Sequence, residues 1–369
     1  MIHAGDMAGT WWSSKTGGTA GDLRGKSPVE SVRPRHPGRV KDFGLPQYRD
    51  RDGNSTVFFD AGQGDAIVFL HGLGGNLTQW ALVAPDLARS HRVLGLDLPG
   101  FGGTHRLRGR LTYDRLADEV FGLLDRRGVS RAYLVGHSFG GAVATNMALA
   151  APERLRGLVL VSPAGYFRYP GWMRLGSRVL FNRAVFASSV CLSAPFIKEL
   201  VCGGDYGPGV EVFDEATWQT RHSVRFLMNF VHAVHALRPE LVQVTYLERL
   251  REIAAPMHMV WGEDDLVLPS AQGLAAMRLA PRGAISRLPG VGHMPIFERP
   301  EAVIAAIRDV VVRAQPPREA PEVPERAWPG LERDLAPALE SDAPSVPCGA
   351  GDDSQGEASF SAAALRGAR

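Results

Sequence analysis

One serine of this chain stands where it could act as a nucleophile. Ser138 lies between Gly136 and Gly140, directly after the apolar run 131–135 and before a segment of small residues typical of a helix. A sharp turn between a strand and a helix exposes such a hydroxyl, and flanking glycines let the two segments approach each other closely. The pattern predicts a nucleophilic serine, whose chemistry depends on partners elsewhere in the chain.

Two downstream residues have the right types to be those partners. A serine hydroxyl is a weak nucleophile at neutral pH, so it needs a histidine to accept its proton and a carboxylate to orient that histidine. His293 follows the strand-like run 284–288, and Asp265 follows the strand-like run 257–261. Functional groups of an open parallel sheet converge in the loops at the carboxyl ends of its strands. We therefore expect Ser138, His293 and Asp265 to meet.

Other histidines suit structural roles better. His71 and His137 each follow an apolar run, and we expect both to be structural. His222, His232 and His235 lie in a helix-patterned stretch, where an i, i+3 pair could bind a metal ion. That stretch offers no third ligand, so the sequence predicts no metal site.

Short apolar runs alternate with helix-patterned segments along the middle of the chain. Such runs predict buried strands at 66–70, 92–96, 132–135, 158–161 and 257–261. Between them, residues 112–127 place five apolar side chains on one helical face, and Gly128 is a stop signal. Strands that alternate with helices predict an α/β fold with a mostly parallel, doubly wound sheet.

The chain divides into a core, an insertion and two terminal extensions. We expect residues 56–162 and 256–314 to form the core, and residues 163–255, which are aromatic and helical in character, to form an inserted helical lid. Residues 1–55 are rich in Gly, Ser, Thr, Pro and Arg, and residues 315–369 are rich in Pro and Ala with 10 acidic and 5 basic residues. Because neither extension has hydrophobic periodicity, both are expected to be disordered.

Composition excludes several classes of protein. The 369 residues carry a formal net charge of +2 without a basic cluster, so we expect no nucleic-acid partner. Three cysteines, Cys191, Cys202 and Cys348, are too few for a disulfide framework, which favours a cytoplasmic location. No stretch approaches the roughly 18 apolar residues that span a membrane. The N-terminus also lacks the apolar core of a secretion signal.

Further segments occur in an order that matches a known family. The chain has the order Ser138, Asp265, His293, and it carries HGLGG at 71–75, DLPGFG at 97–102, WGEDDLVLP at 261–269 and GHMPIFE at 292–298. Together with the serine turn, these segments resemble those of the α/β-hydrolase fold family over about residues 57–313. Asp265 occupies the position that matches the family's acid, so we prefer it to its neighbour Asp264.

The resemblance implies further site residues. The oxyanion of an acyl-transfer reaction is held by two backbone N–H groups, which by the resemblance belong to Leu73 and Phe139. His71 and Gly72 would support the first of these donors. The resemblance implies no cofactor.

A serine at this turn also narrows the reaction. It argues against haloalkane dehalogenases and epoxide hydrolases, the family branches with an aspartate nucleophile. Esterases and lipases, thioesterases, lactonases, proline iminopeptidases, perhydrolases and carbon–carbon bond hydrolases of ring-cleavage products all use a serine. We expect hydrolysis of a carboxylic ester through an acyl-enzyme, because the carbon–carbon bond hydrolases more often carry asparagine where this chain has His137. A non-catalytic ligand-binding module of the same fold is the alternative of a different class.

The expected lid is rich in aromatic side chains. They are Tyr166, Phe167, Tyr169, Trp172, Trp218, Phe226 and Phe230. Such an inventory suits a small apolar or aromatic substrate, although packing within the lid explains most of these residues equally well.

Overall fold

In the computed structural model, the described residues are 29–31, 45–50, 55–107, 109–167, 170–193, 200–203, 213 and 224–315. The chain splits into two compact units, Met1–Pro316 and Pro317–Arg369, and every described residue belongs to the first. Apart from Gln315, the expected C-terminal tail of residues 315–369 lies outside the described residues.

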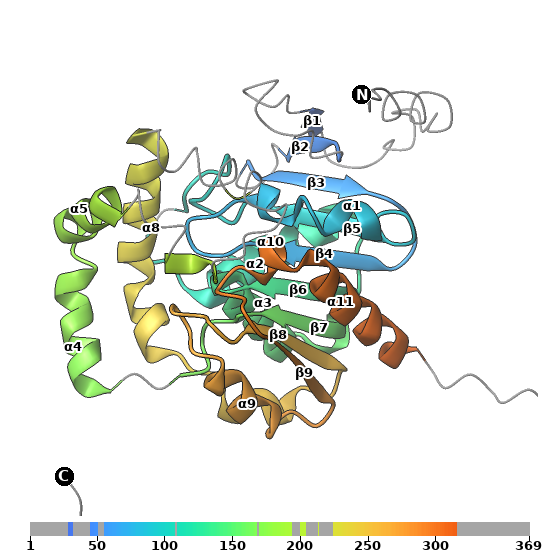
Figure 1. Cartoon of the computed structure of the whole chain (residues 1–369). Helices are drawn as coiled ribbons and strands as arrows, with labels where there is room; N and C mark the ends of the chain where they lie inside the picture. The colour runs from blue at the N-terminus through green and yellow to red at the C-terminus, as the bar shows by residue number, and fades with distance from the viewer. Residues whose placement is uncertain are drawn as a thin grey trace, which may run out of the picture. The chain divides into compact units, whose positions relative to one another are not determined.

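A nine-stranded sheet organises the first unit (Figure 1). Its strand order is β1-β2-β3-β5-β4-β6-β7-β8-β9. The strands from β5 to β9 in that order run parallel, whereas β1, β2 and β3 are antiparallel additions. The bounds are β1 Val29–Ser31, β2 Gln47–Asp50, β3 Val57–Ala61, β4 Ala66–Leu70, β5 Arg92–Leu96, β6 Ala132–His137, β7 Leu155–Val161, β8 Met257–Gly262 and β9 Gly283–Leu288. All five predicted strands are present, so the predicted α/β fold with a mostly parallel sheet is confirmed.

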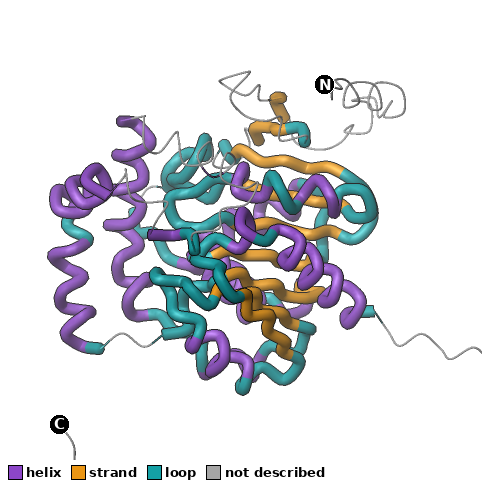
Figure 2. The backbone as a smooth tube through the Cα atoms, viewed as in Figure 1, coloured by secondary structure: helices purple, strands orange, loops and turns teal. Residues whose placement is uncertain are grey.

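Both faces of this sheet are buried by helices. Along β4, Val68 and Leu70 belong to one hydrophobic cluster while Ile67 and Phe69 belong to another, as the period of two in a strand requires. The helices over the first face are α2 Tyr113–Arg126, α3 Phe139–Ala150 and α9 Ala271–Met277; those over the second are α1 Ala84–Leu87, α10 Pro295–Glu298 and α11 Pro300–Ala314. Figure 2 shows strands between helices, the doubly wound arrangement expected of the sequence.

Helix α2 illustrates how closely the pattern determined an element. Thr112 caps its first turn by accepting a hydrogen bond from the Arg115 N–H at 3.2 Å, and the buried side chains are those on the predicted apolar face. The prediction of a helix over 112–127 is confirmed to within one residue at either end.

The N-terminal extension is more structured than predicted. Strands β1 and β2 lie within residues 1–55, and Tyr48 packs on Phe58 of β3 with ring centroids 5.6 Å apart. The buried Asp50 also pairs with Arg126 of α2 at 2.6 Å. The expectation of disorder is therefore wrong for these two strands, which are too short to show a readable alternation.

Between β7 and β8 the described residues contain three long helices. They are α4 Gly171–Leu180, α5 Arg183–Ser193 and α8 Val224–Gln243, followed by the short 3-10 helix η6 Glu248–Glu252. We call α4, α5 and α8 the helical insert; Figure 1 shows them beside the sheet, on its left. Helix α8 continues through Pro239 and buries Val231, Val234 and Leu237. Among the described helices, none has the length and apolar character needed to cross a membrane.

Candidate active site

Ser138 occupies a strained turn at the carboxyl end of β6. Its backbone φ is 49° and ψ is −116°, a region that side-chain-bearing residues rarely adopt. A Cβ atom on Gly136 would lie 2.4 Å from the carbonyl oxygen of Gly140, and one on Gly140 would lie 2.2 Å from that of Leu70. Both glycines are therefore required for the turn from β6 into α3, as the sequence predicts.

The three residues expected to meet lie in one hydrogen-bonded chain. His293 Nε2 is 3.0 Å from Ser138 Oγ, and His293 Nδ1 is 2.8 Å from Asp265 Oδ2. All three side chains are buried. They come from the loops after β6, β8 and β9, parallel strands of the run β6-β7-β8-β9 whose carboxyl ends face the same edge.

Asp265 is fixed by its own loop, whereas Asp264 points elsewhere. Asp265 Oδ1 accepts hydrogen bonds from the backbone N–H groups of Val267 at 2.9 Å and Leu268 at 2.7 Å. The indole N–H of Trp261 donates to Oδ2 at 3.2 Å. Asp264 is exposed, so it is Asp265 that the structure brings to His293.

The loop after β4 is held by side chains on both sides. The Leu98 N–H donates to His71 Nε2 at 2.9 Å, so the Nδ1 atom of that ring carries the proton, which it donates to the Gly72 carbonyl at 2.8 Å. Burial lowers the pKa of His71 to about 4, which keeps the ring neutral. The Gly72 N–H in turn donates to Gln79 Oε1 at 2.9 Å. Hydrogen bonds to both residues therefore fix the backbone of this loop at His71 and Gly72.

Two backbone donors were expected beside Ser138. The N–H groups of Leu73 and Phe139 donate to no described residue of the protein. Phe139 is the first residue of α3, where a helix leaves its N–H groups without intrahelical acceptors. Both groups are therefore free to bind a ligand oxygen.

The His137 ring contacts the main chain of His293. Its Nε2 atom is 2.9 Å from the carbonyl oxygen of His293, and only a protonated nitrogen can donate that bond. Its Nδ1 atom has no hydrogen-bond partner among the described residues. Burial, followed by the nearby His293, lowers the pKa of His137 to about 3. A neutral His137 therefore anchors the main chain of His293, consistent with its predicted structural role.

The histidines of the helical insert make separate contacts. His235 Nδ1 is 2.9 Å from the carbonyl oxygen of Phe181, and His232 Nε2 is 3.3 Å from Arg183. His222 lies outside the described residues. Where the chain is described, no group of three His, Cys, Asp or Glu side chains is placed to hold a metal ion.

Comparison with known proteins decides the family. A family model described as alpha/beta hydrolase fold matches residues 65–300, well over half of the chain. The chain belongs to this family. The parallel strands β4 to β9, the serine turn, Asp265 and His293 of this hydrolase-fold protein all lie within the matched residues.

Curated relatives place it among proteins of several activities. A Pseudomonas putida protein named as the dihydrolipoyllysine-residue acetyltransferase component of an acetoin cleaving system is 29% identical over 269 residues, or 70% of this chain and 67% of that protein. A 2-hydroxy-6-oxo-6-phenylhexa-2,4-dienoate hydrolase of Burkholderia cepacia is 29% identical over 269 residues, or 66% of this chain and 86% of that protein. A thermophilic esterase structure from Thermogutta terrifontis shares the fold, with a TM-score of 0.60, 24% identity and coverage of 79% and 100%.

One residue that organises the site of this hydrolase-fold protein was missed from the sequence. The buried carboxylate of Glu298 accepts backbone N–H groups from Gly292 at 3.1 Å and Met294 at 3.2 Å, on either side of His293. It also accepts the Gly203 N–H at 2.7 Å. Burial raises the pKa of Glu298, against the effect of these donors. The sign of this role in the sequence is that the acidic Glu298 directly follows two apolar residues, Ile296 and Phe297.

Asp97 has a comparable role beside the loop that follows β4. Its buried carboxylate accepts the N–H groups of Leu77 and Gly103, each at 2.7 Å. Burial raises the pKa of Asp97 to about 6. The sequence pattern identified the turn that begins at Asp97, but it did not identify the two loops that this carboxylate holds together.

Helix α8 closes over the same loops. A Cβ atom on Gly74 would lie 3.0 Å from the ring of Phe230, and one on Gly100 would lie 3.7 Å from Ala233. Behind them Phe139 packs against Phe101 at 5.9 Å and Tyr113 at 5.7 Å between ring centroids. The surroundings of Ser138 are therefore aromatic and apolar.

The aromatic side chains of the expected lid lie in different environments. Phe230 lies against the loop at Gly74, and Tyr166 is buried with its hydroxyl 2.6 Å from Thr145 Oγ1. Trp172, in contrast, is exposed on α4 and belongs to no packed core of the described residues. Tyr169, Trp218 and the side chain of Phe226 lie outside the described residues.

Proposed function

We propose that this protein is a serine hydrolase that cleaves a carboxylic ester through a covalent acyl-enzyme. The observation that carries the proposal is the hydrogen-bonded chain from Ser138 Oγ through His293 to Asp265, with distances of 3.0 Å and 2.8 Å. Membership of the α/β-hydrolase family supports it. The same arrangement of nucleophile, base and orienting acid activates serine in other hydrolases.

The mechanism has two acyl-transfer steps. His293 Nε2 takes the proton of Ser138 as Oγ attacks the ester carbonyl, and Asp265 stabilises the resulting imidazolium. The Leu73 and Phe139 N–H groups hold the oxyanion of the tetrahedral intermediate. His293 then gives its proton to the leaving alcohol, and the acyl-enzyme forms. A water that His293 deprotonates attacks this ester, and the acid is released as Ser138 regains its proton.

The residues around Ser138 point to the substrate class. Phe101, Phe139 and Phe230 make the surroundings of Ser138 aromatic and apolar. Such a lining favours a small apolar or aromatic ester. On this proposal residues 56–162 and 256–314 are the catalytic core, and residues 163–255 act as the lid.

A second candidate is hydrolysis of a carbon–carbon bond in a ring-cleavage product. It is favoured by the relative from Burkholderia cepacia, whose name gives such an activity. Both candidates use Ser138, so a substrate panel separates them. Faster turnover of a vinylogous 1,5-diketone than of any phenyl or nitrophenyl ester would assign the second candidate.

Replacement of the nucleophile tests the chemistry. Ser138→Ala is expected to lower kcat for a nitrophenyl ester by roughly 10⁴-fold or more and to abolish labelling by a fluorophosphonate probe. The matched control is Ser162→Ala, because Ser162 directly follows the neighbouring strand β7, is buried and also has a positive φ of 41°. The control should retain labelling. Undiminished labelling of Ser138→Ala, or loss of labelling in both variants, would contradict the assignment.

A further inference from the structure

Helix α4 turns its apolar side away from the protein. Trp172, Leu175 and Val179 lie at i, i+3 and i+7, so they share one helical face, and they are 75%, 64% and 67% exposed. Ser177 lies on the opposite face and is buried. A helix that packs only within its own protein directs its apolar stripe toward the core. The orientation of α4 is the reverse of that arrangement.

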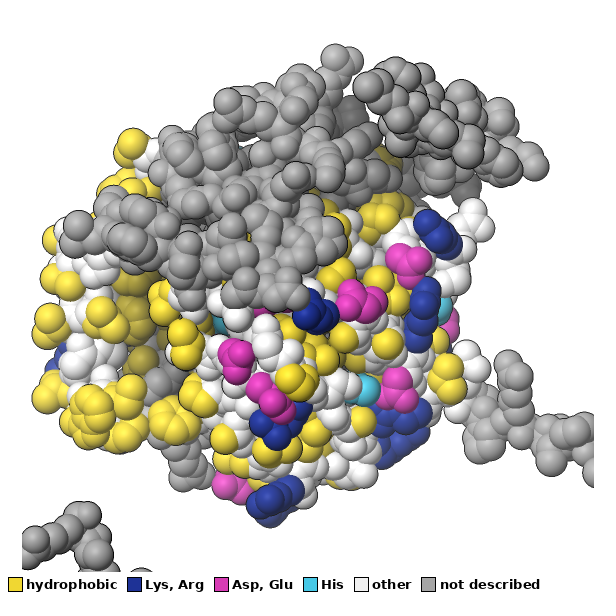
Figure 3. Space-filling view, in the orientation of Figure 1, with side chains coloured by type: hydrophobic (Ala, Val, Ile, Leu, Met, Phe, Trp, Pro, Cys, Tyr) yellow, Lys and Arg dark blue, Asp and Glu magenta, His cyan; other side chains and the backbone are white. Residues whose placement is uncertain are grey.

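This surface continues beyond the three residues. Leu180 at the end of α4 and Val185 on the adjacent α5 are also exposed. We call these five side chains, Trp172, Leu175, Val179, Leu180 and Val185, the apolar face. Figure 3 shows hydrophobic side chains gathered over this side of the molecule. Single exposed apolar residues are ordinary, but a contiguous exposed group indicates an interaction site.

The apolar face lies in a basic part of the chain. Residues 163–198 contain five Lys and Arg residues and no Asp or Glu. Arg174 and Arg178 of α4 and Arg183 of α5 are exposed, beside the apolar face. Glu240, the acidic residue of α8, is directed to Arg110 at 3.7 Å. A partner for this surface must therefore combine apolar contact with negative charge.

A second copy of the chain does not supply that combination. An isologous dimer through the apolar face would place Arg174, Arg178 and Arg183 of each copy near the same residues of the other. Among the described residues of α4 and α5 no acidic side chain is present to pair with them. A bilayer that contains anionic phospholipid supplies both acyl chains and phosphate groups.

We propose that the apolar face of α4 and α5 docks this protein on the surface of an anionic phospholipid membrane. Trp172, Leu175 and Val179 enter the boundary between headgroups and acyl chains, where tryptophan is favoured. Arg174 and Arg178 extend from the flank of the helix to the lipid phosphates. With ten residues, α4 is roughly 15 Å long and a bilayer core is about 30 Å thick, so the helix lies in the membrane plane.

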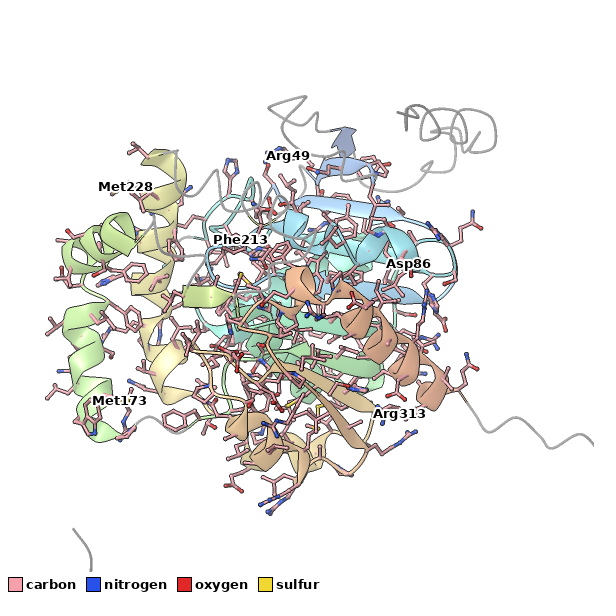
Figure 4. All side chains as sticks on the ribbon, in the orientation of Figure 1. Arg49, Asp86, Met173, Phe213, Met228 and Arg313 are labelled. Atoms are coloured by element: carbon pink, nitrogen blue, oxygen red, sulfur yellow. The ribbon has the colours of Figure 1, made fainter. Side chains whose placement is uncertain are left out.

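Docking at this surface leaves the proposed chemistry untouched. The helices that carry the apolar face belong to the helical insert, whereas Ser138, Asp265 and His293 follow strands of the sheet. Met173 on α4 and Met228 on α8 mark opposite ends of the insert in Figure 4. Membrane binding is therefore measured separately from hydrolysis, and Ser138→Ala protein serves for it because the variant leaves lipid esters intact.

Vesicle flotation tests the proposal with the full chain. Ser138→Ala protein is mixed with vesicles of phosphatidylcholine alone or with about one third phosphatidylglycerol. We expect flotation with the anionic vesicles, at least about tenfold weaker flotation with the neutral ones, and loss of binding as salt rises from about 50 mM to about 500 mM. Equal binding to both vesicles, or binding to neither, would overturn the proposal.

Two valines of equal exposure provide matched variants. Val179→Asp on α4 is expected to weaken vesicle binding by about tenfold or more, because a charge replaces an inserted side chain. Val312 on α11 is 66% exposed, against 67% for Val179, and Figure 1 shows α11 on the other side of the sheet from α4. Val312→Asp should bind like the parent protein, and the melting temperatures of both variants show that they are folded.

A further measurement separates a membrane from a second copy. Sedimentation velocity of the parent protein and of Val179→Asp reports the oligomeric state without lipid. A monomer that floats with anionic vesicles supports the proposal. A dimer that Val179→Asp dissociates, with no vesicle binding by either protein, would assign the apolar face to a second copy and overturn it. Equal loss of binding in Val179→Asp and Val312→Asp would also overturn it.

Discussion

Helices α3 and α4 direct their side chains in opposite ways. All residues of α3 from Phe139 to Ala148 are buried between the sheet and α2, whereas Ser177 is the buried residue of α4. Close packing on every side fixes α3, and with it the backbone of Ser138, to a single position. Helix α4 rests on α5 and α8 through one narrow side. The site for chemistry and the surface for docking can therefore change independently.

The largest expected difference between α3 and α4 is in the effect of a glycine-to-alanine substitution on the free energy of unfolding. Gly140→Ala on α3 places a Cβ atom 2.2 Å from the Leu70 carbonyl oxygen, so we expect a loss of roughly 3 kcal/mol or more in the free energy of unfolding. Gly176 on α4 has no atom within 4 Å of the added Cβ. Gly176→Ala should therefore stabilise the protein by about 0.5–1 kcal/mol through helix propensity.

Denaturant unfolding of the two variants measures the contrast. A tolerated alanine at Gly140 would mean that the β6–α3 turn is looser than its contacts indicate. A destabilised Gly176→Ala protein would mean that α4 is more closely covered than its exposure shows.

Glu298→Gln should lower both the stability of the core and the rate of hydrolysis. The amide nitrogen would face the N–H donors of Gly203, Gly292 or Met294, which leaves at least one donor unpaired and costs about 1–3 kcal/mol of stability. Displacement of His293 should also lower kcat by about 10- to 100-fold. The comparison variant is Glu301→Gln, an exposed acid at the start of α11.

The rate of fluorophosphonate labelling distinguishes positioning from stability alone. It is measured in buffer where both variants remain folded. If Glu298→Gln labels as fast as the parent protein, the carboxylate supports the fold without positioning His293.

His137 is expected to contribute a pH dependence to the stability of the folded chain. Its pKa is about 3 in the folded chain, below the ordinary value of 6.5, because it is buried. The unfolded chain therefore binds an extra proton between these values, so this contribution to stability is present above about pH 6.5 and decreases as the pH falls. The stability advantage of the parent over His137→Gln should decrease by about 1.4 kcal/mol between about pH 5.5 and pH 4.5.

Urea unfolding at several pH values measures that difference. The comparison variant is His105→Gln, at an exposed position. Parallel curves for His137→Gln and the parent would show that His137 is accessible to protons in the folded state. The His137 ring would then be less completely buried than its neighbours in β6 and α3.

Local patterns predicted most of the fold because its strands and helices are themselves local. Apolar runs marked β4 to β8, and Thr112 with a periodic apolar face marked α2. Candidate residues for the site could also be chosen from the sequence alone, because it contains the glycines around Ser138 and the order of Asp265 and His293. Whether they meet depends on strand order, which follows from pairing between distant segments.

Features held by distant contacts escaped the sequence analysis. Glu298 binds Gly203, 95 residues away, and an isolated glutamate shows no sign of that partner. The direction of α4 was also hidden, because Trp172 fits a substrate pocket and an outward face equally well by type. An amphipathic pattern defines which residues share a side, and only packing determines which way that side points.

The antiparallel strands at the start of the sheet set the smallest unit that can be handled as a stable domain. Strand β2 pairs with β3, whose Val57, Phe58 and Phe59 are fully or almost fully buried. Cutting the chain to the family match at residues 65–300 would remove β3 and most of α11, and cutting it after Asp50 would leave β3 as a bare apolar edge. Such an edge is a template for aggregation. A well-behaved fragment of this protein therefore begins before Gln47 and ends after Ala314.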